Sequence, residues 1–186
     1  AWIPTEALTL KGIELIGRTL GLVGCGNIGK LVARFALGMD MKVLAYDVFQ
    51  DASFAPSPDF RYAALDEVLR GSDIISLHCP ALPAPRGEPA GRPLIDAAAI
   101  AKMKKGVFLV NTARADLIDP AALREALAGG QVAGASMDVF KTEPPTGDAL
   151  VGDDRVLATP HVGGFTDESV DRAVDLAVDN LLAALK

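Results

Sequence analysis

The feature that most constrains the fold is a G-x-G-x-x-G segment at residues 24–29, which follows an apolar run at residues 19–25 and opens a stretch of helical periodicity. Such an apolar run is typical of a buried parallel strand. Gly24 permits the tight turn, Gly26 lets the backbone approach a pyrophosphate, and Gly29 lets the helix pack closely on the strand. The helix N-terminus then offers free N–H groups to phosphates. The segment therefore predicts a dinucleotide-binding turn.

An acidic residue ends the next predicted strand. Asp47 follows the strand at 43–46 and lies 18 residues after Gly29, near the interval expected for an acid that binds the adenosine ribose. Its carboxylate can accept hydrogen bonds from both ribose hydroxyls of NAD, and it would repel the 2′-phosphate of NADP. No arginine follows it directly. Taken alone, Asp47 is also compatible with a turn residue at the end of a strand. Its position after the glycine-rich segment favours the role of binding NAD.

Strands and helices alternate along the rest of the chain. This pattern predicts an α/β fold, a Rossmann-type doubly wound parallel sheet with right-handed crossovers and helices on both faces. Further strands are expected at 73–78, 107–110, 132–139 and 156–158, and helices at 27–37, 65–69, 96–103, 120–128 and 167–185.

Two of these helices have informative side chains. The first places one set of apolar residues on one side, namely Ile28, Leu31, Val32 and Phe35. The last has Thr166 as its expected N-cap. It also repeats aspartate at fourfold spacing, at 167, 171, 175 and 179. A solvated face explains this acidic row, and contact with a basic surface of a missing domain is the alternative.

Composition bounds the class of protein. The 186 residues suffice for one domain, which we place at 17–186, after a connecting segment at 1–16. The net charge of −6, with acids and bases interspersed, argues against a nucleic-acid partner. No apolar run approaches a membrane span and no signal peptide precedes the first strand, so we expect a cytoplasmic protein. Two cysteines, Cys25 and Cys79, predict reduced thiols and no metal site.

Three charged or titratable residues follow three successive later strands: Arg114, Glu143 and His161. Ligands of open α/β sheets bind outside the carboxyl ends of the strands, so one crevice can hold all three side chains. Histidine can take up and release a hydroxyl proton, a carboxylate orients the ring, and arginine binds a carboxylate and polarises a carbonyl. Each residue alone is also compatible with a surface ion pair, a loop acid or a strand cap. Together they favour a dehydrogenase.

Residues 17–47 and 107–169 resemble the D-isomer-specific 2-hydroxyacid dehydrogenase family, in particular its phosphoglycerate dehydrogenase-like members. Four ordered motifs carry the resemblance: residues 21–29; Asn111-Thr112-Ala113-Arg114 with 117–119; 138–140 with Glu143-Pro144-Pro145; and 159–164.

The resemblance implies an NAD-dependent enzyme that transfers hydride between NAD(H) and a D-2-hydroxyacid or 2-keto acid. His161 would be the acid/base, Glu143 its partner and Arg114 the substrate-binding cation. Asp138 would hold the carboxamide of the nicotinamide. The implied cofactor-binding residues are Gly24, Gly26, Asn27, Ile28, Gly29, Asp47, Cys79, Thr112, Ala113, Arg114, Asp138, His161, Gly163 and Gly164.

The chain also departs from the family pattern. The connection at 81–93 is longer than usual, His78 is expected to pack at a strand end, and Phe165 occupies a variable position that can touch substrate. The substrate domain of the family is largely absent. We therefore expect the chain to bind NAD but to turn over slowly or not at all alone, and to form a homodimer. The sequence does not name the 2-hydroxyacid.

Two alternatives remain open. One is a dinucleotide-sensing corepressor-like binding module that keeps the fold but acts through partners; the presence of His161 ranks it behind an enzyme. The other is a different NAD-using enzyme on the same fold, such as an amino-acid dehydrogenase or adenosylhomocysteine hydrolase. Those enzymes lack this order of Arg, Glu and His.

Overall fold

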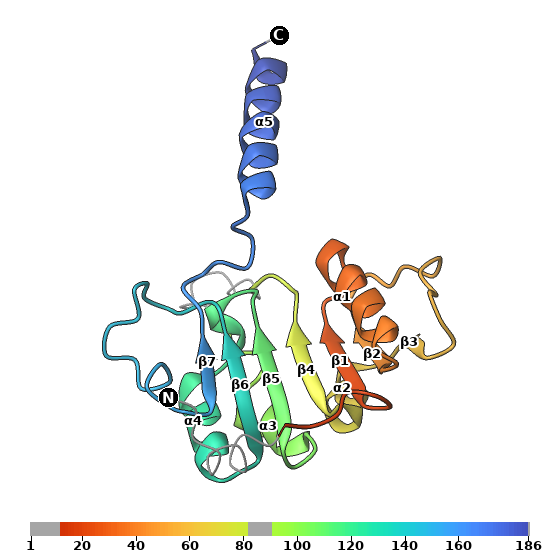
Figure 1. Cartoon of the computed structure of the whole chain (residues 1–186), viewed down its shortest axis with the longest axis vertical. Coiled ribbons are helices and arrows are strands. Elements are labelled where there is room, and N and C mark those ends of the chain that lie inside the picture. Colours follow the sequence, from red (N-terminus) through yellow and green to blue (C-terminus); the bar gives the residue numbers. More distant parts are fainter. Residues whose placement is uncertain (1–11, 82–90, 186) are drawn as a thin grey trace, which may run out of the picture.

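A computed structural model describes residues 12–81 and 91–185. Its seven strands form one parallel sheet in the order β3-β2-β1-β4-β5-β6-β7 (Figure 1), which confirms the doubly wound fold. The strands are β1 Thr19–Val23, β2 Lys42–Tyr46, β3 Phe60–Tyr62, β4 Ile74–Leu77, β5 Val107–Asn111, β6 Val132–Met137 and β7 Val156–Ala158. The helices are α1 Asn27–Gly38, α2 Leu65–Gly71, α3 Ala97–Lys102, α4 Pro120–Ala128 and α5 Asp167–Ala184.

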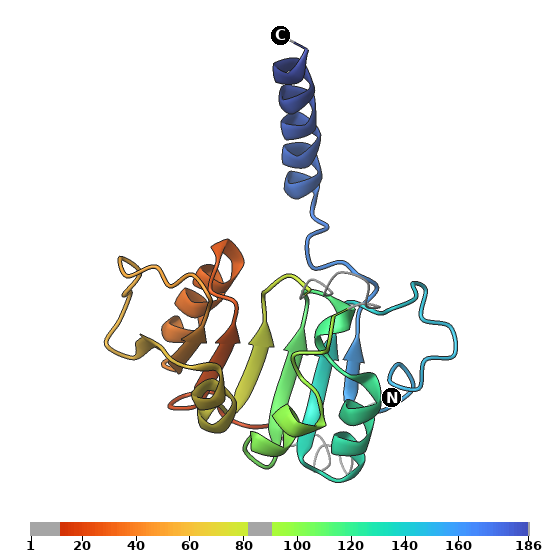
Figure 2. The ribbon, with the colours of Figure 1, turned by 180° about the vertical axis from the view of Figure 1, so that it is seen from behind.

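Helices cover the sheet unequally. Helix α1 lies on one face, and α2, α3 and α4 lie on the other, as the two opposite views show (Figures 1 and 2). Each face has its own apolar core. The larger core joins α2, α3 and α4 to the central strands, and the smaller one joins α1 to β1, β2 and β3. In the described part of the chain, the buried strand residues of the core beneath α1 belong to β1, β2 and β3, and Leu157 of β7 is 66% exposed.

Helix α1 buries a different side from the one that its large apolar residues suggest. Its buried residues are Gly29, Ala33 and Ala36, whereas Ile28 and Phe35 are 64% and 67% exposed. Leu31 is also exposed, and Val32 is half-buried. Small side chains bring the helix backbone close to the sheet, so the stripe of larger residues is left facing solvent.

Two elements were not expected from the sequence. Strand β3 has three residues, too few for a periodic pattern, and it exists because Phe60 pairs with Val43 of β2. The Phe60 ring also packs edge-to-face on Phe54, with centroids 5.0 Å apart. A 3-10 helix at Ala115–Leu117 follows β5. Both are set by tertiary contacts and local turn geometry.

Helix α5 stands away from the sheet (Figures 1 and 2), and none of its residues is buried. Thr166 caps it as predicted, in a reciprocal capping box with Ser169. Its acidic row is exposed, and so is an apolar stripe that includes Val170, Val174, Val178 and Leu181. Helices with such a stripe bury it against another surface.

Two expectations concern segments outside the described residues. The connecting segment at 1–16 is described only from residue 12, and the loop at 81–93 lacks 82–90. Among the described helices, none is long and apolar enough to cross a membrane.

Candidate functional site

The glycine-rich turn connects β1 to α1 at the point where the strand order reverses. Gly24 has a φ of +97°, and a Cβ there would lie 2.6 Å from the carbonyl carbon of His78. A Cβ on Gly29 would lie 2.2 Å from the carbonyl oxygen of Gly24. A Cβ on Gly26 would meet only open space. Two glycines are therefore required by the protein's own packing, and Gly26 leaves the approach to the helix N-terminus clear.

The N-terminus of α1 suits an anion. Its N-cap, Gly26, provides no side-chain cap, and its first turn contains no acidic residue. The N–H groups of this turn are thus free to bind a phosphate, with the positive end of the helix dipole behind them. Asn27 and Ile28 are its first two residues, and Ile28 is 64% exposed.

Asp47 lies directly after β2, beside this turn. Its Oδ2 accepts a hydrogen bond from the N–H of Cys25 at 2.6 Å, and its Oδ1 accepts one from the N–H of Phe49 at 2.9 Å. Because a carboxylate has about four acceptor positions, Asp47 can still accept hydrogen bonds from ribose hydroxyls. The residues present therefore fit NAD: a pyrophosphate on the glycine turn and an adenosine ribose on Asp47.

Asn111 organises the turn that carries Arg114. It is fully buried at the end of β5; its Nδ2 donates to the Arg114 carbonyl at 2.9 Å, and its Oδ1 accepts from the Ala113 N–H at 3.0 Å. The Arg114 side chain is exposed, and its Nη1 donates to the Ala113 carbonyl at 2.6 Å. Thr112 is exposed in the same turn. The sequence identifies Asn111 only as part of a motif, and its position as an amide at the end of a buried strand is the signal that points to this role.

Glu143 and His161 meet although the loops that carry them follow different strands. Nδ1 of His161 lies 2.9 Å from Oε2 of Glu143, and Oε1 of Glu143 accepts the N–H of Phe140 at 3.0 Å. The hydrogen bond from Phe140 and then that from His161 lower the pKa of Glu143. The carboxylate therefore stays charged beside the ring. His161 itself has a φ of +55°, a strained backbone for a residue with a Cβ.

Asp138 secures the segment that carries this histidine. It is 3% exposed; its Oδ1 accepts from the Thr159 hydroxyl at 2.6 Å and from the Val162 N–H at 2.8 Å, and its Oδ2 accepts from the Gly163 N–H at 2.8 Å. Burial raises the pKa of Asp138, but these hydrogen bonds outweigh it and leave the pKa below its ordinary value. The structure thus gives Asp138 a positioning role, in addition to the contact with nicotinamide expected for it.

Gly163 is required by this arrangement. A Cβ on Gly163 would lie 2.9 Å from Oδ2 of Asp138, whereas one on Gly164 would meet open space. Phe165, two residues beyond, is 75% exposed. The segment after β7 is therefore held by Asp138 at Val162 and Gly163, and it is exposed to solvent at Phe165.

His78 and Cys79 follow β4, and burial shifts the pKa of each side chain. The Nε2 of His78 lies 2.9 Å from the Ser76 hydroxyl, and burial lowers the pKa of His78. This matches the expected packing role better than that of a second base. Cys79 is half-buried, and burial raises the pKa of its thiol, so the thiol stays protonated. In residues 12–81 and 91–185, no group of three His, Cys, Asp or Glu could hold a metal ion.

One crevice collects the three residues from the later strands. Arg114, Glu143 and His161 line it together with Ala115, Asp116, Val139, Phe140 and Lys141. Two cations, two carboxylates and an imidazole therefore share one exposed hollow at the carboxyl edge of the sheet. This arrangement can bind a carboxylate and exchange a proton with a neighbouring hydroxyl.

Comparisons with known proteins agree with this geometry. A family model described as "D-isomer specific 2-hydroxyacid dehydrogenase, NAD binding domain" matches residues 1–163. Hydroxypyruvate reductase of Thermotoga maritima is 45% identical over 170 residues, which are 90% of this chain and 53% of that protein. D-3-phosphoglycerate dehydrogenase of Mycobacterium tuberculosis is 41% identical over 177 residues, 95% of this chain and 32% of that protein.

Solved structures agree as well. D-lactate dehydrogenase of Lactobacillus jensenii, determined with NAD+, has a TM-score of 0.82 and 34% sequence identity, and the match covers 95% of this chain and 55% of that one. The chain thus spans about half the length of the reductase and of this structure. The relatives named here are reductases and dehydrogenases and give no support to the corepressor alternative.

Proposed function

Because this chain belongs to the D-isomer specific 2-hydroxyacid dehydrogenase family, as its NAD-binding domain, we propose that the protein transfers hydride between NAD(H) and a D-2-hydroxyacid or its 2-keto acid. The observation that carries the proposal is the 2.9 Å contact between His161 and Glu143 in a crevice that Arg114 also lines.

The chemistry follows from the protonation of the histidine. With its Nδ1–H donating to Glu143, the neutral ring has a free lone pair on Nε2. In the oxidation, this atom takes the hydroxyl proton of the substrate while the C2 hydride leaves. In the reduction, the imidazolium returns the proton to the carbonyl oxygen. NAD, when bound, supplies the hydride acceptor and NADH the donor.

The other residues of the crevice bind and orient. The Arg114 guanidinium would leave the Ala113 carbonyl to bind the substrate carboxylate and polarise the carbonyl that is reduced. The glycine turn would hold the pyrophosphate and Asp47 the adenosine ribose. Thr112, Ala113, Asp138, Gly163 and Gly164 would surround the nicotinamide side, with Cys79 near the cofactor.

The whole protein requires more than this chain under the proposal. The chain covers about half of the reductase from Thermotoga maritima, and a substrate domain would complete the pocket. The exposed apolar stripe of α5, with no buried residue, supports a surface that is covered in the whole protein. We propose that the protein is cytoplasmic and forms a homodimer. Sedimentation equilibrium of the chain and of the whole protein would test the homodimer.

The decisive experiment is a panel of 2-keto acids with NADH, followed by the NADH absorbance, on the whole protein and on the chain alone. The whole protein is expected to reduce at least one member, and the chain alone to bind NADH with little turnover. Failure of the whole protein on the entire panel, with NADH bound, would refute hydride transfer to this substrate class. Normal dehydrogenase rates by the chain alone would refute the need for a second domain.

A further inference from the structure

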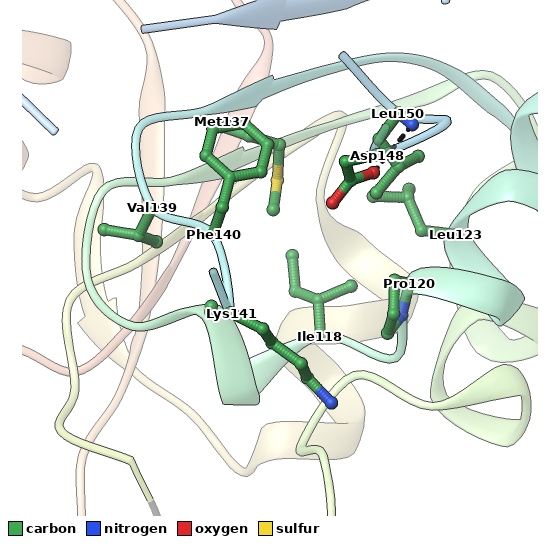
Figure 3. A pocket seen from close by; sticks show the side chains of 10 residues that line it. Ile118, Pro120, Leu123, Met137, Val139, Phe140, Lys141, Asp148 and Leu150 are labelled. Atoms are coloured by element: carbon green, nitrogen blue, oxygen red, sulfur yellow. Dashed lines mark hydrogen bonds between the residues drawn. The ribbon is translucent and has the colours of Figure 1, made fainter. Parts of the chain in front are cut away.

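A second pocket adjoins the catalytic crevice on the α4 side of the sheet, at the root of the loop that carries Glu143 (Figure 3). Its walls are apolar and come from buried residues of α4, β6 and the two loops beside them, including Ile118, Leu123, Met137 and Leu150. The volume is about 60 Å³. Since a cavity that binds benzene measures roughly 150 Å³, the pocket has room for a short branched alkyl group but not for an aromatic ring.

Two opposite charges stand at the rim of this pocket. Lys141 and Asp148 lie on different sides of it (Figure 3). Lys141 is well exposed, and its only ion pair in the described part of the chain is a long one, with Nζ 4.0 Å from Oδ1 of Asp116. Asp148 accepts the Leu150 N–H with Oδ1 at 2.9 Å, and no hydrogen bond to its Oδ2 occurs among the described residues. One cation and one anion are therefore available to a ligand.

We propose that this pocket binds an α-amino acid with a short branched aliphatic side chain. The side chain enters the apolar cavity, the carboxylate pairs with Lys141, and the ammonium group pairs with Asp148. An apolar carboxylate without an amino group would pair with Lys141, but Asp148 would repel it. An apolar amine without a carboxylate would pair with Asp148, but Lys141 would repel it. A zwitterion satisfies both rim charges.

Occupancy of this pocket is coupled to the catalytic crevice because the two share Ala115, Val139, Phe140 and Lys141. Phe140 lines both the pocket and the crevice, and its N–H holds Oε1 of Glu143 at 3.0 Å. A ligand that displaces Phe140 moves this N–H, and with it the carboxylate that contacts His161. Binding in the pocket therefore changes the environment of the histidine.

The test is NMR of the chain itself, and it does not depend on turnover. Four methionines give four methyl signals, and only Met137 lines the pocket. L-Valine is expected to shift the Met137 methyl signal saturably. Isovalerate, which lacks only the ammonium group, and isobutylamine, which lacks only the carboxylate, are expected to bind at least about tenfold more weakly because one charge-assisted contact is lost. L-Phenylalanine is expected not to bind, because its ring exceeds the cavity.

Matched variants test the rim. Lys141→Met and Asp148→Asn are each expected to weaken L-valine binding about tenfold, and the control Lys105→Met, an exposed lysine at the other end of the sheet, should leave it unchanged. The two histidines give a second readout: at constant pH, L-valine should move the C2 proton signal of His161 and leave that of His78 in place.

Several results would overturn the inference. Absence of a saturable Met137 shift, or equal binding of L-valine by wild type and Lys141→Met, would exclude the site. Equal binding of valine, isovalerate and isobutylamine would exclude the zwitterion as its ligand class. Binding without any movement of the His161 signal would exclude the coupling.

Discussion

Nδ1 of His161 lies 2.9 Å from Oε2 of Glu143, 18 positions away in sequence, and the other oxygen of the same carboxylate is held by the Phe140 N–H. The carboxylate is therefore fixed before it meets the ring. This double attachment determines which nitrogen of His161 carries the proton, and that leaves Nε2 for the substrate.

Replacing the histidine should remove the proton exchange and little else. In the whole protein, His161→Gln is expected to lower the rate of hydride transfer by about 10²–10⁴-fold, the usual contribution of a general acid/base. Affinity for NADH, measured by its fluorescence, should stay within about twofold because the pyrophosphate and ribose contacts are distant. A rate close to that of wild type would show that His161 is not the acid/base.

Glu143→Gln should act through the tautomer of the ring. The amide oxygen can still accept the Phe140 N–H, but its NH₂ group donates to Nδ1 and so places the ring proton on Nε2. We expect a rate loss of about 10²–10⁴-fold. Nitrogen NMR of the chain would report the change of tautomer directly. Glu143→Gln with an unchanged tautomer and a wild-type rate would contradict this role.

Asp47 should determine the choice of dinucleotide. Asp47→Asn removes the charge next to the ribose and leaves two backbone N–H donors facing a single carbonyl oxygen. Binding of NAD, measured calorimetrically, is expected to fall about tenfold, as for loss of a hydrogen bond to a charged group. The preference for NAD over NADP should become smaller, because the Asp47 carboxylate no longer repels the 2′-phosphate of NADP. Asp51→Asn, at a nearby half-buried acid paired with Lys30, is the control and should leave the preference unchanged.

The Asp138 carboxylate should contribute to acid sensitivity. Its pKa is lowered in the folded protein, so its contribution to stability is fully present above the ordinary aspartate pKa and is lost as the pH falls through the lower, folded value. Asp138→Asn is expected to reduce the free energy of unfolding near neutral pH by about 2 kcal/mol. In urea titrations, the difference from wild type should narrow below about pH 4. A difference that is constant with pH would show that the charge is not responsible.

The packing of α1 can be tested with two substitutions. Ala33 is fully buried against the sheet, so Ala33→Leu should overpack it and lower the free energy of unfolding by about 1–3 kcal/mol. Phe35→Ala, on the exposed side, should change the free energy by about 0.5 kcal/mol or less. Denaturant unfolding of the chain measures both. The opposite ranking would mean that the large apolar residues of α1 are the buried ones.

The sequence was sufficient for the main elements of the fold, which depend on local order. The glycine turn, the acid after β2 and the alternation of strands and helices predict a doubly wound sheet, because period, turn residues and caps act over a few neighbouring positions. Thr166 was identifiable as a cap for the same reason. The same reasoning brought Arg114, Glu143 and His161 to one edge of the sheet, since parallel strands end together.

Tertiary structure decided what depends on distance between segments. The burial of Ala33 instead of Phe35, the pairing of β3 with β2, the use of Asp138 to pin the segment after β7 and the pocket under Phe140 are invisible in the sequence. Each arises from how closely two distant backbones approach, and that distance is the outcome of packing the whole domain rather than of any single residue.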